Sequence, residues 1–262
     1  MKRTGLALAA LWIACGTAAG AADAKPEKWV PMFNGKDLTG WTPKFTGYAA
    51  GENPFDTFRI VNGNLVVSYD GYSEFGDRFG HLFYGKKLSH YRIRLEYRFA
   101  PKEKQVKGGP GWGLMNSGIM LHCQPVETMR KDQAFPVSIE AQFLGDDGTG
   151  KRGSGNMCSP GTHVVLNGKL EKEHCPKTSK TAVAPGEWTR FEVEVRGGAS
   201  IKHMVNGVVT AEYQEPQYDA EDPDGKTQME GKPLEITDGY VALQAESHPV
   251  EFRNVELLEL AP

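Results

Sequence analysis

The sequence predicts an all-β chain folded as an antiparallel β-sandwich or jelly roll. Residues 91–99 and 191–196 alternate apolar with charged side chains, which is the pattern of strands with one buried face. Asn-Gly pairs at 62–63 and 206–207 are typical of tight hairpin turns. The 31 Gly and 16 Pro residues indicate many turns, and no segment has the periodicity of a long amphipathic helix. About a dozen strands without alternating helices favour this class of fold.

Six more segments, taken in chain order, are short, largely apolar and bounded by turn residues. We expect strands at residues 80–84, 117–123, 137–144, 162–166, 239–246 and 250–260. The polar stretch 214–233 contains Pro216, Pro223 and Pro233 and is expected to form a long surface loop, and residues 47–54 are a second candidate loop. No internal repeat or domain-sized linker occurs, so residues 29–260 are predicted to form one domain.

Residues 1–21 have the pattern of a secretory signal peptide. Lys2 and Arg3 precede an apolar run, and small residues end the segment at Ala21. Cleavage there would change the net charge from −3 to −5 and would deliver the protein to the periplasm or the medium. Lipid anchoring at Cys15 is the less favoured alternative. No later segment approaches the ~20 apolar residues that a transmembrane helix needs.

Charge and cysteine content narrow the class of protein further. The balance of 30 Lys+Arg against 33 Asp+Glu argues against a nucleic-acid partner, which would require a basic surface. Cys158 and Cys175, seventeen residues apart, could close a disulfide loop worth roughly 3 kcal/mol. Cys123 is expected to be a buried free thiol. Other pairings, or a zinc site that includes His174, are disfavoured because no C-x-x-C spacing occurs.

Three of the predicted strands have an unusual second face. Side chains at i and i+2 share a face, so polar groups lie opposite the apolar face of strands 117–123, 137–144 and 239–246. If these strands are neighbours, one sheet face carries His122, Glu140, Gln142, Gln244 and Glu246. Small residues beside them, Gly118, Ser138 and Ala242, would leave room for a ligand. A sugar-binding surface and an ordinary solvated face are about equally favoured.

An ordered set of short motifs resembles one known family. The motifs are FNGKDLTGW at 33–41, NSGIM at 116–120, EAQ at 140–142, GEW at 186–188, NG at 206–207, GYVALQ at 239–244 and EFRNV at 251–255. Together they resemble the 3-keto-disaccharide hydrolase domain over residues 29–260. The resemblance implies a concanavalin A-like lectin/glucanase jelly roll and a carbohydrate substrate. His122 stands where many members have Arg, and Gly145 stands where many have Asp.

The resemblance implies cleavage of glycosides already oxidised at C3. The ketone acidifies the C2–H bond, a base removes that proton, the glycosidic oxygen leaves, and water adds to the unsaturated sugar. We expect Glu140 or His122 to be the base and Glu246 the acid. Substrate-binding residues are expected to be Gln142, Gln244, Asn116 and Trp112, and a divalent metal is considered, with His122, Glu140 and His163 as its ligands.

Two other functions stay open at this point. Glu140 and Glu246 could form the carboxylate pair of a conventional glycosidase. A carbohydrate-binding module without catalysis would use the same fold. Glu192 and Glu194 form a second acidic pair, which is expected to line a solvated strand face rather than a site. The sequence does not set the sugar, the linkage or the oligomeric state.

Overall fold

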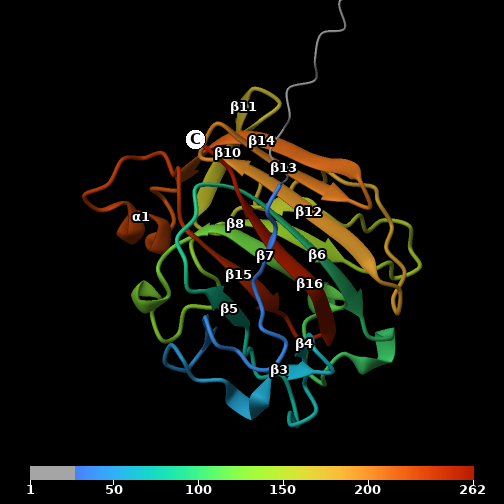
Figure 1. Ribbon diagram of the computed structural model, residues 1–262. Coiled ribbons are helices and arrows are strands. Elements are labelled where there is room, and N and C mark those ends of the chain that lie inside the picture. Colours follow the sequence, from blue (N-terminus) through green and yellow to red (C-terminus); the bar gives the residue numbers. More distant parts are fainter. Residues whose placement is uncertain (1–26) are drawn as a thin grey trace, which may run out of the picture.

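The computed structural model describes residues 27–262, which form two antiparallel sheets packed face to face (Figure 1). The expected signal peptide, residues 1–21 with Cys15, lies outside the described residues. The predicted all-β sandwich is confirmed. No helix among the described residues is long and apolar enough to cross a membrane.

The larger sheet has ten strands and forms one layer of the sandwich. Its order is β11 (Lys169–Glu171), β10 (Thr162–Leu166), β14 (Val208–Tyr218), β13 (Ser200–Val205), β12 (Thr189–Arg196), β6 (His90–Phe99), β16 (Val250–Glu259), β4 (Asn64–Val67) and β3 (Phe58–Val61), with β1 (Val30–Pro31) paired to β16.

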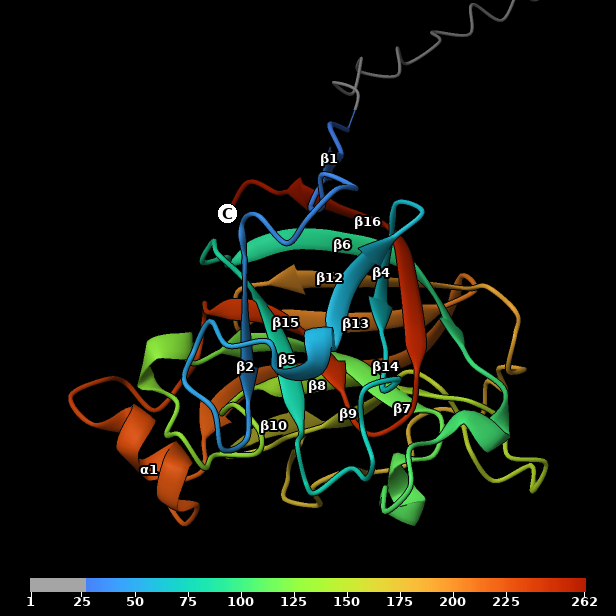
Figure 2. The ribbon, with the colours of Figure 1, turned by 90° about the horizontal axis from the view of Figure 1, so that it is seen from below.

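The smaller sheet has six strands and carries the polar faces singled out above. Its order is β2 (Trp41–Phe45), β5 (Gly80–Tyr84), β15 (Tyr240–Ala245), β7 (Asn116–Cys123), β8 (Ile139–Leu144) and β9 (Asn156–Cys158). Figure 2 views the sandwich from below, with β5, β15, β7 and β8 in this layer. The three strands with polar second faces, β15, β7 and β8, are therefore direct neighbours.

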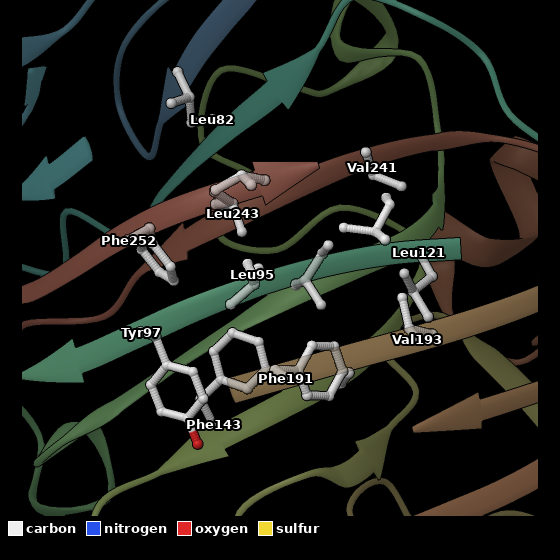
Figure 3. Close-up of a cluster of buried hydrophobic side chains, with 14 of the residues drawn as sticks. Leu82, Leu95, Tyr97, Leu121, Phe143, Phe191, Val193, Val241, Leu243 and Phe252 are labelled. Atoms are coloured by element: carbon white, nitrogen blue, oxygen red, sulfur yellow. The ribbon is translucent and has the colours of Figure 1, made fainter. Parts of the chain in front are cut away.

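The core lies between the two sheets and consists of the inward side chains of both (Figure 3). Phe143 of β8 stacks on Tyr97 of β6, with ring centroids 4.4 Å apart, and meets Phe191 of β12 at 4.7 Å. All three rings are fully buried. Burial of such side chains is worth about 1.5–3 kcal/mol each, so this contact fixes which face of β8 is turned outward.

Turn residues act as the sequence predicts. Asn62 and Gly63 both have positive φ, 52° and 81°, and join β3 to β4 with Val61 opposite Asn64. Such a two-residue turn needs φ > 0 at both positions, which Asn and Gly tolerate best. The pair Asn206 and Gly207 does the same between β13 and β14.

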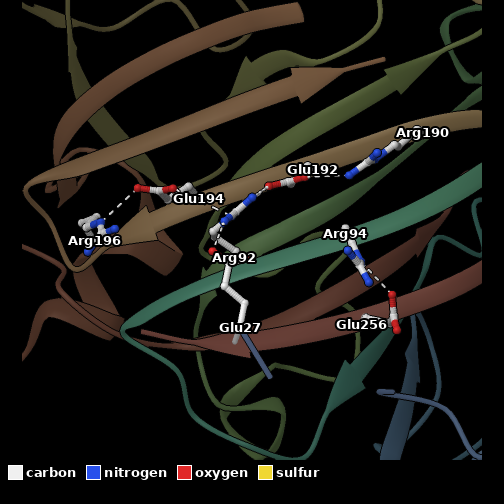
Figure 4. Close-up of polar contacts among 8 residues, drawn as sticks. All are labelled: Glu27, Arg92, Arg94, Arg190, Glu192, Glu194, Arg196 and Glu256. Carbon is white, nitrogen blue, oxygen red and sulfur yellow. Dashed lines mark hydrogen bonds and ion pairs between the residues drawn. The ribbon is translucent and has the colours of Figure 1, made fainter. Parts of the chain in front are cut away.

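The outer face of the ten-stranded sheet is an ion-pair surface (Figure 4). Glu192 and Glu194 lie on it, outside any pocket as expected, but Glu192 is not solvated: it is 8% exposed, because Arg92 and Arg190 cover its carboxylate. On the neighbouring strands, Nε of Arg94 is 2.7 Å from Oε2 of Glu256. Glu192, Glu194 and Glu256 therefore have cationic partners, and they lie on a different sheet from the polar faces of strands 117–123, 137–144 and 239–246.

The prediction of one long loop over residues 214–233 is wrong. Strand β14 continues to Tyr218, and a short helix, α1 (Pro223–Met229), follows. The side chain of Asp222 accepts hydrogen bonds from the backbone N–H groups of Asp224 and Gly225, and Pro223 occupies the first turn. An Asp-Pro pair is a common start of a helix and is visible at 222–223 in the sequence, but the three prolines of the segment led to the prediction of a loop. The remaining helices are 3-10 turns at Pro54–Asp56, Lys102–Lys104, Gly111–Gly113 and Val126–Thr128.

Candidate functional site

The outer face of the six-stranded sheet brings together most of the predicted site residues. The inward alternation of Ile139, Ala141 and Phe143 turns Glu140 and Gln142 outward on β8. The register pairs Gly118 of β7 with Gln142, and Leu243 of β15 with Ile119 of β7. Gln244 therefore lies across from Gly118, which has no side chain. The room that the sequence predicted beside Gly118 is taken by the Glu140 side chain, and Ala242 packs in an apolar cluster.

A pocket of about 640 Å³ opens over this part of the sheet. Its floor is formed by strand residues, and its walls come from loops. The lining residues are Gly111, Trp112, Asn116, Phe135, Glu140, Gln142, Leu144, Asp147, Arg152, Pro160, His174, Cys175 and Glu246. The volume is typical of sites that enclose a small organic ligand.

Two carboxyl groups are buried in the pocket. Oε1 of Glu140 lies directly over Gly118, where a Cβ would be only 2.6 Å from it. Within the described residues, Oε1 of Glu140 and Oε2 of Glu246 have no hydrogen-bond partner. Burial raises the pKa of Glu140 to about 8. Burial and the nearby Glu140 raise the pKa of Glu246 well above its usual range, while Arg152 opposes that rise. Both carboxyls therefore hold protons near neutral pH.

Further polar groups without partners lie beside the carboxyl pair. Both amide atoms of Gln244 and Oδ1 of Asn116 are buried and unpaired among the described residues. Buried polar atoms are almost always satisfied in proteins, so such a cluster indicates a place where a ligand or solvent supplies the partner. Gln244 does not itself line the pocket, but it lies on the same sheet face, next to Gly118.

His81 belongs to this cluster although the sequence analysis did not select it. It lies opposite Gln244 on the neighbouring strand β5, is fully buried, and neither ring nitrogen has a partner in the described chain. Burial and the positive charge of Lys44 lower the pKa of His81 to about 3, so the ring is neutral. A histidine inside a short apolar strand was the only sequence signal for it.

Arg152 and Asp147 also reach the pocket and were not predicted. Nη1 of Arg152 donates to the carbonyl of Leu114 at 2.5 Å, which ties this loop arginine to the end of the turn before β7. Its charge acts on Glu246, as the effect on the pKa of that group shows. Both residues come from the irregular segment 145–155, where no periodic pattern indicates which way a side chain points.

The rim of the pocket combines aromatic rings with a disulfide-bonded loop. Trp112 is 53% exposed, and its ring stacks on Phe79 with the two centroids 5.5 Å apart. Cys158 and Cys175 form a disulfide, the pairing that their spacing suggested. The bond holds Cys175 and the adjacent His174 against the pocket, after the chain has passed through β10 and β11 of the other sheet.

An apolar cluster covers the rest of this sheet face. Phe83, Met120, Cys123, Met129 and Ala242 pack together there. Cys123 is a buried free thiol, as predicted. The pocket is therefore confined to the end of the face where β7 begins and β15 ends.

The prediction that His122 shares the face of Glu140 is wrong. Tyr240 pairs with Cys123 while Ala242 pairs with Met120, so β7 carries one extra residue at this point. His122 takes up that residue with a φ of 51°. Such a bulge reverses the alternation, and Nε2 of His122 donates to the carbonyl of Gly197, in a turn of the ten-stranded sheet, at 3.0 Å. Burial lowers the pKa of His122 to about 4.

The predicted metal ligands do not come together either. His122 is turned to the other sheet, and Nε2 of His163 lies 3.5 Å from Oδ1 of Asp219, whereas Glu140 faces the pocket. Within residues 27–262, no three His, Cys, Asp or Glu side chains are grouped so that they could hold a metal ion. The predicted ligand set therefore does not fit a metal.

Comparison with known proteins identifies the family. The model of the 3-keto-alpha-glucoside-1,2-lyase-like domain matches residues 28–258. The chain belongs to this family. The match covers all the strands that form the pocket floor and every lining residue named above.

Solved structures show the same fold at low sequence identity. A Parabacteroides distasonis protein, described as a "putative glycosyl hydrolase", is 22% identical with a TM-score of 0.54, covering 89% of this chain and 94% of its own. A Bacillus subtilis protein with a galectin-like fold is 8% identical with a TM-score of 0.51, covering 85% and 90%. An alginate lyase is 12% identical with a TM-score of 0.52, covering 86% and 91%. None of the curated proteins compared with this chain matches it.

The structure also shows where the two residues that depart from the expected family pattern, His122 and Gly145, lie relative to the pocket. His122, at the position where the resemblance led us to expect Arg, points away from the pocket, and the guanidinium that lines the pocket is that of Arg152, from a loop. At Gly145, in place of the usual Asp, a Cβ would approach Met115 to 2.8 Å, and Asp147 lines the pocket two residues later.

Proposed function

We propose that this protein cleaves 3-keto-glycosides, 3-keto-disaccharides among them, by proton abstraction at C2, elimination of the glycosidic oxygen, and hydration. One observation carries the proposal: two buried carboxyl groups with unpaired oxygens, Glu140 and Glu246, lie in one pocket of a chain that belongs to this family. A carbohydrate-active role agrees with the family and the fold, and the specific reaction is the proposal.

Glu140 is the proposed base. The burial that raises its pKa to about 8 makes its carboxylate a stronger base than a solvated glutamate. A stronger base is suited to removing the C2 proton, because only the adjacent ketone makes that C–H bond acidic. Gly118 has no side chain, which makes room for the Glu140 carboxyl on the floor of the pocket, where a substrate can reach it.

Arg152 is the proposed stabiliser of the enolate that forms when the proton leaves. The negative charge develops on the former ketone oxygen, and a fixed guanidinium in a partly dry pocket stabilises such a charge more than water does. Two carbonyl groups, of Leu114 and Trp112, hold the Arg152 side chain in place. The amides of Asn116 and Gln142, which line the pocket, are suited to sugar hydroxyls, and the unpaired amide of Gln244 lies behind them on the same sheet face.

Glu246 is the proposed acid. Burial and the nearby Glu140 raise its pKa well above the usual range, so one carboxyl of the pair keeps a proton when the other ionises. A protonated carboxyl can donate to the departing glycosidic oxygen. The exposed ring of Trp112 gives the apolar face of a pyranose a surface on which to stack.

The test is turnover of a 3-keto-disaccharide and of the same disaccharide without the ketone, each with and without a chelator. Cleavage of the keto sugar alone is expected. Glu140→Gln should lower kcat at least 10³-fold, whereas Glu192→Gln, which removes a carboxylate on the other sheet, serves as the matched control. Cleavage of the ordinary disaccharide would indicate a two-carboxylate glycosidase, and binding without cleavage would indicate a carbohydrate-binding module.

A further inference from the structure

A row of buried polar side chains crosses the six-stranded sheet beside the pocket. Lys44 of β2 pairs with His81 of β5, and His81 pairs with Gln244 of β15. These strands follow one another in the sheet, and the next strand, β7, places Gly118 opposite Gln244. Directly opposed side chains have Cβ atoms about 4.5–5.5 Å apart. Each member of the row is therefore within reach of the next, directly or through one water molecule.

The row ends at the carboxyl group of Glu140. Oε1 of Glu140 lies 2.6 Å from the point where a Cβ of Gly118 would be, on the face that Gln244 shares. Gln244 is the next side chain along the row from that point, so its amide can reach Oε1. In the described chain, Oε1 of Glu140, both amide atoms of Gln244 and both ring nitrogens of His81 lack a hydrogen-bond partner. Such atoms are almost always satisfied when buried, which indicates that they serve one another.

Lys44 and His81 are covered by protein and do not line the pocket. The ring of Phe135, which does line it, lies edge-on to His81 with the centroids 5.8 Å apart. Nζ of Lys44 donates to the carbonyls of Phe45 and Lys131, at 2.8 and 3.1 Å. A substrate in the pocket therefore meets neither side chain, and they can act on the reaction only through the rest of the row.

The chemistry of the three side chains gives the row a direction. An ammonium group has three N–H donors and no acceptor, and Lys44 uses two of its donors on carbonyls. Burial and the charge of Lys44 lower the pKa of His81 to about 3, so the ring is neutral, with one donor and one acceptor. The nitrogen nearer Lys44 must accept, and the other then donates to Oε1 of Gln244. This order leaves the NH2 group of Gln244 for the carboxylate of Glu140.

We propose that Lys44, His81 and Gln244 are positioning residues that hold an amide N–H group against the Glu140 carboxylate and so fix the orientation of the base. The inference rests on the proposed function only in the use that it gives to Glu140. The amide stabilises the ionised carboxylate through one oxygen and leaves the other oxygen to the substrate.

The first measurement is the tautomer of His81, read by nitrogen NMR of the isotope-labelled protein. The signal that disappears in His81→Phe assigns it. The wild type should hold one neutral tautomer from pH 5 to pH 9. Lys44→Arg keeps N–H donors without an acceptor and should retain that tautomer, whereas Lys44→Met should show both. A mixture of tautomers in the wild type would overturn the row.

The second measurement is the pKa of Glu140, followed by carbon NMR of its carboxyl group and assigned with Glu140→Gln. Gln244→Met should raise this pKa by about one unit, because the ionised form loses a hydrogen bond to a charged group. His81→Phe, which keeps a ring against Phe135, should raise it less, and it is the second variant should Gln244→Met fail to fold. The same pKa in wild type and in both variants would rule out the positioning role.

Matched controls separate this effect from loss of any buried polar group. Gln228→Met makes the same change at a glutamine of α1 that is 7% exposed, and His122→Phe changes a buried ring that faces the other sheet. Neither should move the pKa of Glu140. The other charged or titratable side chains of the pocket, those of Glu246, Arg152, Asp147 and His174, are present in every variant.

Turnover of a 3-keto-disaccharide gives the kinetic counterpart. At pH 7, Gln244→Met should lower kcat about tenfold with little change in KM, since a pKa one unit higher leaves about a tenth as much ionised base. Loss of affinity at unchanged kcat would contradict positioning and would indicate that Gln244 binds the sugar. Neither NMR measurement uses a substrate, so a failure of the proposed function would not be mistaken for a failure of the row.

Discussion

Burial of the Glu140 carboxyl should set the pH dependence of the reaction. The base must be ionised, and its pKa in the free protein is about 8. Below that pH the proton occupies the group, so kcat/KM should fall about tenfold per pH unit as the pH is lowered from 8. Above pH 8, activity should reach a plateau, because Glu246, whose pKa burial and Glu140 raise well above its usual range, keeps its proton in the proposed mechanism. The measurement is a kcat/KM profile from pH 5 to pH 9.

An acid limb near pH 4.5, the ordinary value for glutamate, would contradict Glu140 as the base. The histidines give a clear internal comparison. Burial lowers the pKa values of His81 and His122 to about 3 and about 4, so neither charges over this range and neither would produce the limb. A limb near 8 therefore does not come from His81 or His122.

Single residues were also where prediction from the sequence failed. The alternation rule correctly placed Glu140, Gln142 and Gln244 on one sheet face, because each lies inside an unbroken strand. It failed at His122, because a bulge with positive φ at a non-glycine residue leaves no local signal. Arg152 and His81 were missed for a related reason: their positions depend on a loop path and on strand neighbours, which are nonlocal.

At the scale of elements, the strands were predictable because their patterns are local. Segments 80–84 and 162–166 coincide with β5 and β10, and most other predicted bounds differ by one or two residues. The orientation of a strand that is buried on both faces is harder to predict, because its sequence has no polar alternation. Strand β5 is apolar on both sides, so its sequence could not show that the side of His81 faces the polar cluster. The sheet order that joins β15, β7 and β8 also lay beyond the sequence pattern.

The disulfide loop gives a prediction at this scale. The Cys158–Cys175 bond fixes the segment that brings His174 to the pocket wall. Replacing both cysteines with serine should lower the free energy of unfolding by about 3 kcal/mol, since a loop of this length then regains its entropy in the unfolded chain. Turnover of 3-keto-disaccharide should also fall, mainly through a higher KM. Urea unfolding and steady-state kinetics measure the two effects.

The control for this prediction is the wild type under reducing conditions. Reduction should reproduce the stability and KM of the double serine variant, while the same reagent should leave that variant unchanged, because Cys123 is already a free buried thiol. A double variant with wild-type KM would show that the loop does not shape the pocket, even if its stability is lower.

At the scale of the whole molecule, the fold and the disulfide bear on where the protein works. Disulfides persist in oxidising compartments, and the described chain contains one that supports a pocket wall. This agrees with the signal pattern of residues 1–21, which lie outside the described residues. We propose that the protein is exported to the periplasm or the medium and acts there on its sugar substrate.

Expression of the full sequence in a bacterial host with an intact export system tests this proposal. We expect a protein in the periplasm or medium that begins at Ala22, carries the Cys158–Cys175 bond and has lost the charges of Lys2 and Arg3. Intact mass before and after reduction measures both features. A variant that lacks residues 2–21 is the control and should stay in the cytosol with reduced cysteines. A diacylglyceryl group on Cys15 would instead establish a lipid anchor, and an uncleaved cytosolic product would overturn export.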